Sequence, residues 1–304
     1  MKQKNTFITN LLKFSEKKNT LQIQKELEDY KDRQSILEKR KLEFNNLKTL
    51  KITETLNYNV KGTSSLFYNN DIYLSYTNGD IFKNNQLFFK NENTVIFTFL
   101  YDEIYFIDTV GNLFRGKNCV YRFNTRIISC DLHKELGIIL FCDINNEIFC
   151  FDLKNNQPIF KNYLKEQRHL KIHEYGNIFL GVSNKCNLFD IRTMKIVHTF
   201  CKNTTIASFF TPNYVISCTD NIIDCYDMRM LKLCGKILSH KNNINLLECN
   251  KFVYTTSLEG EICVSSPVIS VINKEVKVEK CKFISWSDDK LCVVGNNVKI
   301  FGCD

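Results

Sequence analysis

The sequence predicts an all-β domain built from seven repeated units, preceded by an α-helical N-terminal arm. From about residue 52 the chain consists of short apolar runs broken by Asn, Gly and Asp, and equivalent apolar positions recur every 32 to 39 residues. The first 50 residues differ, because they contain no Gly and no Pro. We place the arm at residues 1–50 and the repeat domain at residues 52–304.

The arm is expected to form a basic amphipathic helix. Good helix formers fill residues 20–47. Apolar side chains recur there every seven residues, at Ile23, Tyr30, Leu37 and Phe44. The companion heptad positions hold Gln34 and Lys41, so the pattern of a coiled coil is incomplete. The apolar stripe can dock on the repeat domain or on a partner, or it can pair with a second copy; we do not favour the homodimer.

The arm also carries most of the net charge. It holds 12 Lys and Arg against 7 Asp and Glu, whereas the rest of the chain holds 29 against 26. A basic segment attracts phosphate groups or an acidic protein face. Lys39, Arg40 and Lys41 are therefore candidate contacts for a protein or RNA partner. A solvated Lys-rich helix is an equally weighted alternative.

The repeats define the architecture. Their equivalent positions are Ile72, Ile104, Ile139, Ile178, Val215, Val253 and Leu291. Each lies in an apolar strand followed by a tight polar turn and a second apolar strand, and turns such as Asn78-Gly79 suit hairpins. A further apolar run precedes each hairpin and is expected to line a central channel. A unit of about 40 residues with four strands is one blade of a β-propeller.

Seven units therefore predict a seven-bladed ring. The segment ITETLNYNV (residues 52–60) is expected to supply the outer strand of the last blade, because the sequence stops shortly after Phe301. Such pairing removes an open sheet edge.

Three repeats end with an aromatic-Asp dipeptide, in FDLKN (151–155), FDIRT (189–193) and YDMRM (226–230). With these segments the repeat domain resembles the WD40-repeat family. The resemblance implies that Asp152, Asp190 and Asp227 end third strands and bond the following turn, and that His240 takes the place of the family's Gly-His histidine. No Trp-Asp or Gly-His dipeptide is present, which leaves the exact blade count open.

Few residues suggest chemistry. His169 and His173 have the spacing of a helical metal pair, but their context predicts a strand, in which four residues span about 13 Å. Phosphate-binding glycine loops and nucleophile motifs are absent from the sequence. We therefore expect no enzymatic activity, no catalytic residues, no cofactor and no metal. The 14 cysteines stand mostly in strand-like runs and are expected to be small buried apolar side chains.

Basic residues interleave with aromatic ones in residues 113–126. The basic residues are Arg115, Lys117, Arg122 and Arg126. With Tyr121 and Phe123 they could hold RNA by phosphate contacts and base stacking. The alternative interpretation has buried aromatic rings and solvated arginines. Residues 161–168 are expected to form a loop that contacts a partner.

The leading hypothesis is a non-catalytic scaffold that binds proteins through the propeller faces and the arm within a multi-subunit complex. The alternative is an RNA-contacting subunit of a ribonucleoprotein assembly, in ribosome biogenesis or splicing. No apolar run approaches the ~20 residues of a membrane span. We expect a soluble intracellular protein, nuclear or cytoplasmic, with the nucleus favoured.

Overall fold

The computed structural model describes most of the chain beyond residue 49. The described residues are 50–56, 62–68, 71–164, 166–249, 252–266, 271–277, 281, 283–287, 290–294 and 298–303. The predicted helical arm, with Lys39, Arg40 and Lys41, lies outside them. The chain divides into two compact units, Met1–Leu47 and Lys48–Asp304, and the second unit is described below.

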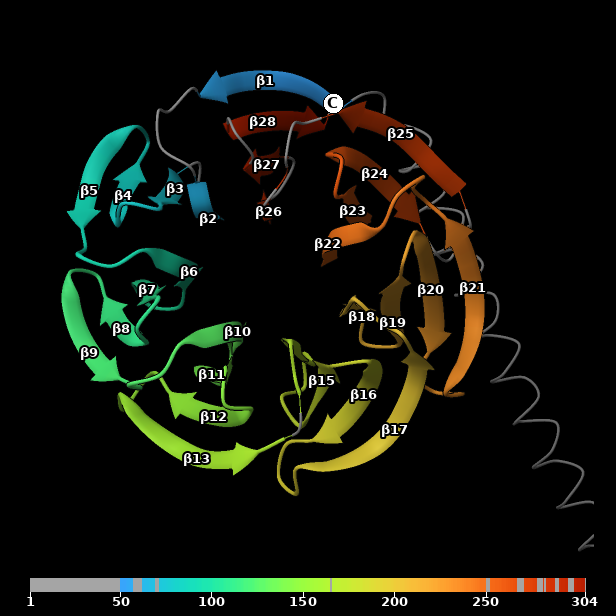
Figure 1. Ribbon diagram of the computed structural model, residues 1–304, viewed down its shortest axis with the longest axis horizontal. Helices are drawn as coiled ribbons and strands as arrows, with labels where there is room; N and C mark the ends of the chain where they lie inside the picture. Colours follow the sequence, from blue (N-terminus) through green and yellow to red (C-terminus); the bar gives the residue numbers. More distant parts are fainter. Residues whose placement is uncertain are drawn as a thin grey trace, which may run out of the picture. The chain divides into compact units, whose positions relative to one another are not determined.

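The second unit contains seven four-stranded antiparallel sheets arranged as blades around a central channel (Figure 1). The strands nearest the channel are β2 (Gly62–Tyr68), β6 (Val95–Leu100), β10 (Ile127–His133), β14 (His169–Ile172), β18 (Ile206–Thr211), β22 (Ile244–Cys249) and β26 (Phe283–Ser287). The second strands are β3 (Asp71–Tyr76), β7 (Ile104–Asp108), β11 (Ile138–Asp143), β15 (Ile178–Val182), β19 (Tyr214–Thr219), β23 (Val253–Ser257) and β27 (Lys290–Val294).

The third strands are β4 (Asp80–Lys83), β8 (Asn112–Arg115), β12 (Glu147–Asp152), β16 (Lys185–Asp190), β20 (Ile222–Asp227), β24 (Glu261–Ser266) and β28 (Val298–Cys303). The outer strands are β5 (Gln86–Lys90), β9 (Asn118–Arg122), β13 (Gln157–Tyr163), β17 (Lys195–Lys202), β21 (Lys232–Leu238), β25 (Val271–Lys277) and β1 (Leu50–Leu56). We number the blades 1 to 7 from the one that begins with β2. The predicted seven-bladed all-β ring is confirmed.

The ring closes by pairing the first strand with the last. β1 runs antiparallel to β28, with Leu50 opposite Cys303 and Ile52 opposite Phe301. The outer strand of blade 7 therefore comes from the N-terminal side of the chain, as predicted. It begins at Leu50, two residues earlier than expected.

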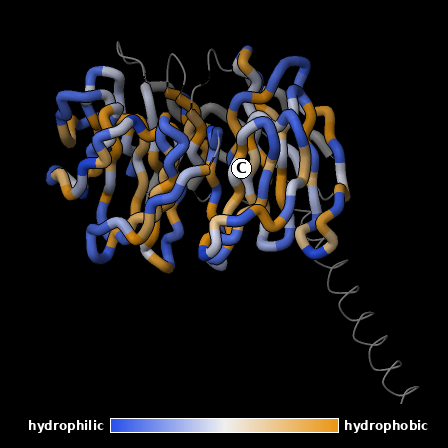
Figure 2. Tube along the Cα trace, turned by 60° about the horizontal axis from the view of Figure 1, so that its bottom comes forward, coloured by the Kyte–Doolittle hydropathy of each residue, from blue (hydrophilic) through white to orange (hydrophobic). Residues whose placement is uncertain are grey.

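The core lies between neighbouring blades. All five residues of β7 are buried, because both faces of a blade pack against other blades and polar alternation is lost. Between blades 2 and 3, the Phe123 ring lies 4.7 Å from that of Phe141, and Tyr121 lies 5.0 Å from Phe151. In Figure 2 the polar residues concentrate toward the turns at the two faces of the ring.

Hairpin turns use the residues that the sequence suggested. Gly79 has φ +85°, and a Cβ atom there would lie 2.1 Å from the carbonyl oxygen of Asn91, so no other residue fits without rearrangement. The cysteine side chains that the structure describes are free thiols, and most are buried. Among the described residues, no helix has the length and apolar character needed to cross a lipid bilayer.

Candidate functional site

One face of the ring carries two sets of turns. We call the turn between the first and second strands of a blade its inner turn, and the turn between the third and fourth strands its outer turn. In each of blades 3, 4 and 5 the outer turn donates a backbone hydrogen bond to the inner turn, over 2.8 to 3.0 Å. The donor and acceptor pairs are Leu153 and Gly137, Ile191 and Asn177, and Met228 and Asn213. The two turns of each blade therefore lie on the same face.

Buried histidines fix the inner turns of blades 3 and 4. His133 Nδ1 accepts a hydrogen bond from the backbone N–H of Leu136 at 3.2 Å, so the ring proton is on Nε2. That Nε2 lies 2.6 Å from the carbonyl oxygen of Glu174, in the inner turn of the next blade. Each bond satisfies a backbone group that a turn would otherwise leave to water.

His173 repeats this arrangement one blade further on. Its Nδ1 accepts from the N–H of Tyr175 at 3.2 Å, and its Nε2 lies 2.9 Å from the carbonyl oxygen of Pro212. The inner turns of blades 3, 4 and 5 are thus joined in series by two imidazole rings. A histidine with both nitrogens bonded to backbone groups has none left for a metal ion.

Side chains reinforce the same series. A Cβ atom on Gly137 would lie 2.6 Å from the hydroxyl of Tyr101, and one on Gly176 would lie 2.2 Å from Leu136 Cδ1. Tyr101 of blade 2 therefore packs against the inner turn of blade 3, and Leu136 of blade 3 packs against that of blade 4. Because glycine has no side chain, each of these turns leaves room for the side chain of the preceding blade.

This face presents apolar side chains to solvent. Leu136 is 46% exposed and Tyr175 is 68% exposed, although both stand on turns held by buried histidines. Beside Tyr175 lies a groove of about 220 Å³, walled by Phe209, Pro212 and His173. The groove is of mixed polarity, because Glu174 and Thr211 also line it. An exposed aromatic side chain next to such a groove is typical of a protein interface.

The outer turns of blades 4 and 5 each carry an Asp–Arg ion pair. Asp190 accepts from the backbone N–H and the guanidinium of Arg192, and these bonds lower the pKa of Asp190 to about 2. Asp227 makes the same contacts with Arg229, which lower its pKa as well. Asp152 accepts from the N–H groups of Lys154 at 2.8 Å and of Asn155. All three aspartates thus hold their turns and position a basic side chain two residues on.

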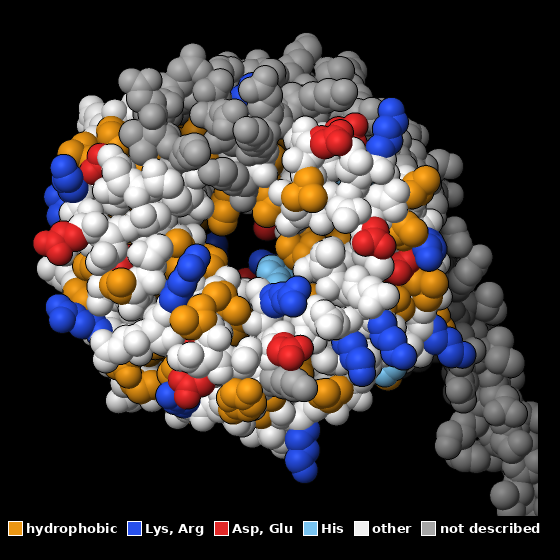
Figure 3. All heavy atoms as spheres, viewed as in Figure 1, with side chains coloured by type: hydrophobic (Ala, Val, Ile, Leu, Met, Phe, Trp, Pro, Cys, Tyr) orange, Lys and Arg blue, Asp and Glu red, His pale blue; other side chains and the backbone are white. Residues whose placement is uncertain are grey.

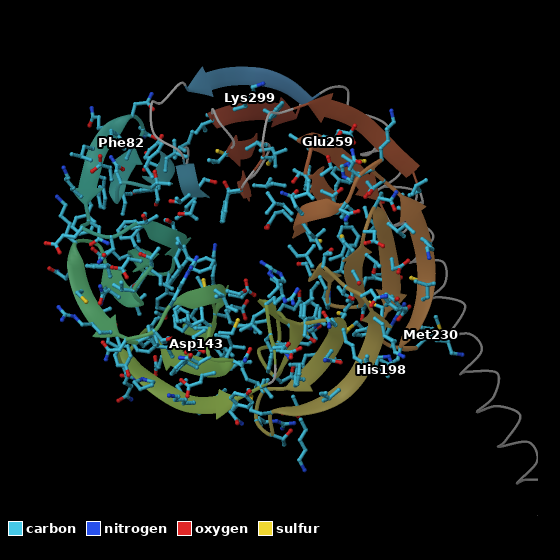
Figure 4. All side chains as sticks on the ribbon, viewed as in Figure 1. Phe82, Asp143, His198, Met230, Glu259 and Lys299 are labelled. Atoms are coloured by element: carbon cyan, nitrogen blue, oxygen red, sulfur yellow. The ribbon has the colours of Figure 1, made fainter. Side chains whose placement is uncertain are left out.

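On the opposite face, two buried aspartates organise the turns between second and third strands. Asp108 accepts from the N–H of Asn112 at 2.8 Å and from the side chain of Asn91. Asp143, labelled in Figure 4, accepts from the N–H of Glu147 and the Thr125 hydroxyl, both at 2.8 Å. Neither aspartate was predicted from the sequence. The sequence pattern that could have indicated them is an Asp at the end of a second strand, four residues before the residue whose N–H it binds, Asn112 or Glu147.

His240 lies between β21 and β22 and is buried. Its Nε2 lies 2.8 Å from the hydroxyl of Thr255 in β23, and its Nδ1 lies 3.7 Å from a carboxylate oxygen of Glu261. The histidine thus ties the start of blade 6 to the second and third strands of the same blade.

The central channel contains charges that neutralise one another. Lys171 Nζ lies 3.1 Å from Asp131 Oδ1, and the other oxygen of Asp131 accepts from the N–H of Ile172 at 2.7 Å. The carboxylate raises the pKa of Lys171, and burial raises that of Glu248. Asp131 and Glu248 help to line a cavity of about 290 Å³, whose other walls include Phe97 and Phe283. Figure 3 shows the open channel with charged side chains at its wall.

The predicted basic strip of blade 2 is divided in two. Arg115, the last residue of β8, pairs with Asp102 and Glu103, and Lys117, just before β9, lies 5.7 Å from the centre of the Phe88 ring. Arg122 is exposed at the other end of β9, opposite Asn112. Arg126 is exposed in the loop that follows. The structure therefore does not gather the four cations into one surface.

The aromatic residues of that segment are not free to stack on bases. Tyr121 and Phe123 pack into the core between blades 2 and 3, as the alternative interpretation predicted. The loop expected over residues 161–168 is also partly wrong, because Lys161 belongs to β13 and pairs with Glu147 at 2.7 Å. The exposed Arg168 follows the strand.

His169 and His173 do not form a metal pair. His169 begins β14 and its burial lowers its pKa to about 3, whereas His173 is occupied by the inner turns. Within the described residues no group of three or more His, Cys, Asp or Glu side chains has a metal-binding arrangement.

No protein-family model and no curated protein matches the sequence. The structure is similar to the crystal structure of the WD40 β-propeller domain of Doa1, with a TM-score of 0.69 and 12% sequence identity. The match covers 83% of this chain and 97% of that chain. Together with the seven closed four-stranded blades, this similarity identifies the fold: the chain is a seven-bladed β-propeller of the WD40 type.

Proposed function

We propose that this protein is a non-catalytic scaffold that binds partner proteins through its propeller. The inner-turn face of blades 3 to 5 is the docking surface in this proposal. The observation that carries it is the exposure of Leu136 and Tyr175 on turns that buried histidines hold in place. Apolar side chains on a rigid support bind at low entropic cost, because little freedom remains to be lost.

The chemistry of the surface indicates the kind of partner. The Tyr175 ring and the groove beside it suit an apolar side chain. Arg192 in the outer turn of the same blade is paired with Asp190 but is 75% exposed, and its remaining guanidinium N–H groups suit an acidic residue at the rim of the contact. The preferred partner is therefore a protein segment with an apolar anchor flanked by carboxylates.

The predicted arm would provide a second attachment point within a multi-subunit complex. Two linked contacts raise the effective concentration of each partner without any catalytic step. The RNA-contacting alternative rests on the basic arm and on Arg122 and Arg126, which are exposed on the propeller.

Affinity capture with the full-length protein tests the proposal. The test variant combines Leu136→Glu with Tyr175→Glu, and the control is Ile159→Glu on β13, where the native side chain is 54% exposed. We expect the test variant to lose its bound proteins by about tenfold and the control to retain them, both after nuclease treatment. Equal retention by both variants contradicts the docking surface, and loss of all partners on nuclease treatment supports the RNA alternative.

A further inference from the structure

Two cysteines face each other across the outer half of blade 4. Cys186 in β16 and Cys201 in β17 are direct register partners. Opposed residues in an antiparallel pair have Cα atoms about 4.5 to 5.5 Å apart, which lies within the range that a disulfide bridges. The backbone therefore already holds the two residues at a separation that a cross-strand disulfide can span.

The sulfur of Cys201 also meets hydroxyl groups at the boundary with blade 5. The Ser217 hydroxyl oxygen of β19 lies 2.9 Å away, and that of Thr204 lies 3.0 Å away. The Tyr226 side chain of β20 also lowers the pKa of this thiol. Ser217 and Thr204 are buried, so water competes little for these bonds. Several donors that converge on one sulfur stabilise its thiolate form.

The two thiols differ in character. The hydrogen bond from Cys186, followed by those from the hydroxyls, lowers the pKa of Cys201 to about 6, even though burial opposes the shift. The same bond and burial raise the pKa of Cys186 well above its usual value. Cys201 is half-buried, whereas Cys186 is fully buried. One residue is thus suited to react with a small oxidant, and the other to resolve the product.

We propose that Cys186 and Cys201 form a peroxide-sensitive dithiol that closes to a disulfide between β16 and β17. In the first step the Cys201 thiolate attacks hydrogen peroxide; an S–O bond forms, the O–O bond breaks, and the departing hydroxide takes a proton to become water. In the second step the Cys186 sulfur attacks Cys201; the S–S bond forms, the S–O bond breaks, and hydroxide leaves with the Cys186 proton as water. Two thiols lose two electrons, and the peroxide is reduced to two waters.

The disulfide changes a contact between blades. In the reduced protein the Cys201 sulfur bonds to Ser217 of blade 5. Oxidation redirects that sulfur toward Cys186 within blade 4. The boundary between blades 4 and 5 then loses a hydrogen-bonded contact.

A second cysteine pair provides an internal comparison. Cys225 and Cys234 lie in β20 and β21 of blade 5, with their sulfur atoms 3.6 Å apart. Burial raises the pKa of Cys225, and Cys234 is exposed and donates to the carbonyl oxygen of Cys225. If proximity and exposure alone decided which pair oxidises first, Cys225 and Cys234 would react first. The hydrogen-bond donors around the Cys201 sulfur instead predict that Cys201 reacts first.

Peptide mass spectrometry of the full-length, pre-reduced protein tests the proposal. With one equivalent of hydrogen peroxide at pH 7, we expect the Cys186–Cys201 linked peptide to form before any Cys225–Cys234 link. In C186S the Cys201 sulfur should accumulate as a sulfenic acid that dimedone traps. In S217A, alkylation of Cys201 at pH 7 should slow several-fold, with the circular dichroism spectrum unchanged.

Mass spectrometry of the wild-type protein tests the proposal even if a variant fails to fold. Earlier oxidation of Cys225 and Cys234 would overturn the proposal, as would oxidation of Cys201 no faster than that of buried Cys142. A profile of Cys201 alkylation against pH is expected to rise through a midpoint near pH 6. A midpoint near the ordinary thiol value of about 8.5 contradicts the activating role of the hydroxyls.

Discussion

His133 and Glu174 are joined across the boundary between blades 3 and 4 by a 2.6 Å hydrogen bond from imidazole Nε2 to the backbone carbonyl oxygen. The same histidine holds its own turn through Nδ1, so one ring sets the geometry of two turns. His173 and Pro212 repeat the relationship at the next boundary. The proposed docking surface is therefore a set of coupled turns rather than independent loops.

Removing one of these imidazoles should lower stability. H133A leaves a buried N–H and a carbonyl group without their partner, which costs about 1 to 3 kcal/mol of unfolding free energy. H173A should cost a similar amount, whereas the half-buried His198 of β17 should be replaceable by Ala at less than about 0.5 kcal/mol. Urea denaturation followed by tryptophan fluorescence or circular dichroism measures all three. Equal, small losses in every variant would show that the histidines do not hold the turns.

The turn on the opposite face depends on Asp143. D143A removes the acceptor of two backbone N–H groups and of the Thr125 hydroxyl in a fully buried site. We expect a loss of about 2 to 4 kcal/mol in unfolding free energy. D152A, at an exposed turn with a similar set of bonds, should cost only about 1 kcal/mol. The two variants should be compared by urea denaturation, and an order of losses opposite to this one would refute the role of burial.

In the channel, Asp131 should matter more than Lys171. D131A removes the partner of both the Lys171 ammonium and the Ile172 N–H, whereas K171M removes the cation and keeps the apolar part of its side chain. The pair is partly exposed, so we expect about 2 kcal/mol for D131A and about 1 kcal/mol for K171M. A double-mutant cycle measures the coupling between them. Purely additive losses would mean that the ion pair contributes nothing.

His169 should make stability depend on acidity. Burial lowers its pKa in the folded protein to about 3, below the ordinary value of 6.5. Between these values the unfolded chain binds the proton more readily, so the free energy of unfolding falls as the pH drops below about 6.5. Between pH 7.5 and pH 5.5 the wild type should lose about 1 kcal/mol more than H169Q. Denaturation curves at both pH values give the comparison; parallel losses would exclude His169 as the source.

The strands could be predicted from the sequence because the apolar residues of each strand are consecutive along the chain. The run IILFCD, for example, is apolar whichever neighbour covers it, and it forms β11. Closure by β1 followed from counting strands. The repeat positions Asp190 and Asp227 were visible because their partners lie two residues away.

The candidate site was mostly hidden from the sequence because its contacts join different blades. His173 was weighed as a metal ligand, but its partner is a carbonyl oxygen 39 residues further along. The environment of Cys201 likewise requires Ser217, which lies on another strand of another blade. The division of the basic strip depends on which end of β9 each residue occupies, and β8–β9 pairing sets that register. None of these contacts can be derived from the spacing of residues along the chain.

Ring closure by β1 underlies every function proposed above, since an open ring could not hold the inner turns in fixed positions. Thermal unfolding by circular dichroism should be compared for two truncations, one lacking residues 1–47 and one lacking residues 1–57. The first should melt within a few degrees of the full-length protein. The second leaves β28 unpaired and should melt lower by on the order of 10 °C, or without a cooperative transition. Equal melting temperatures for the two truncations would contradict closure by β1.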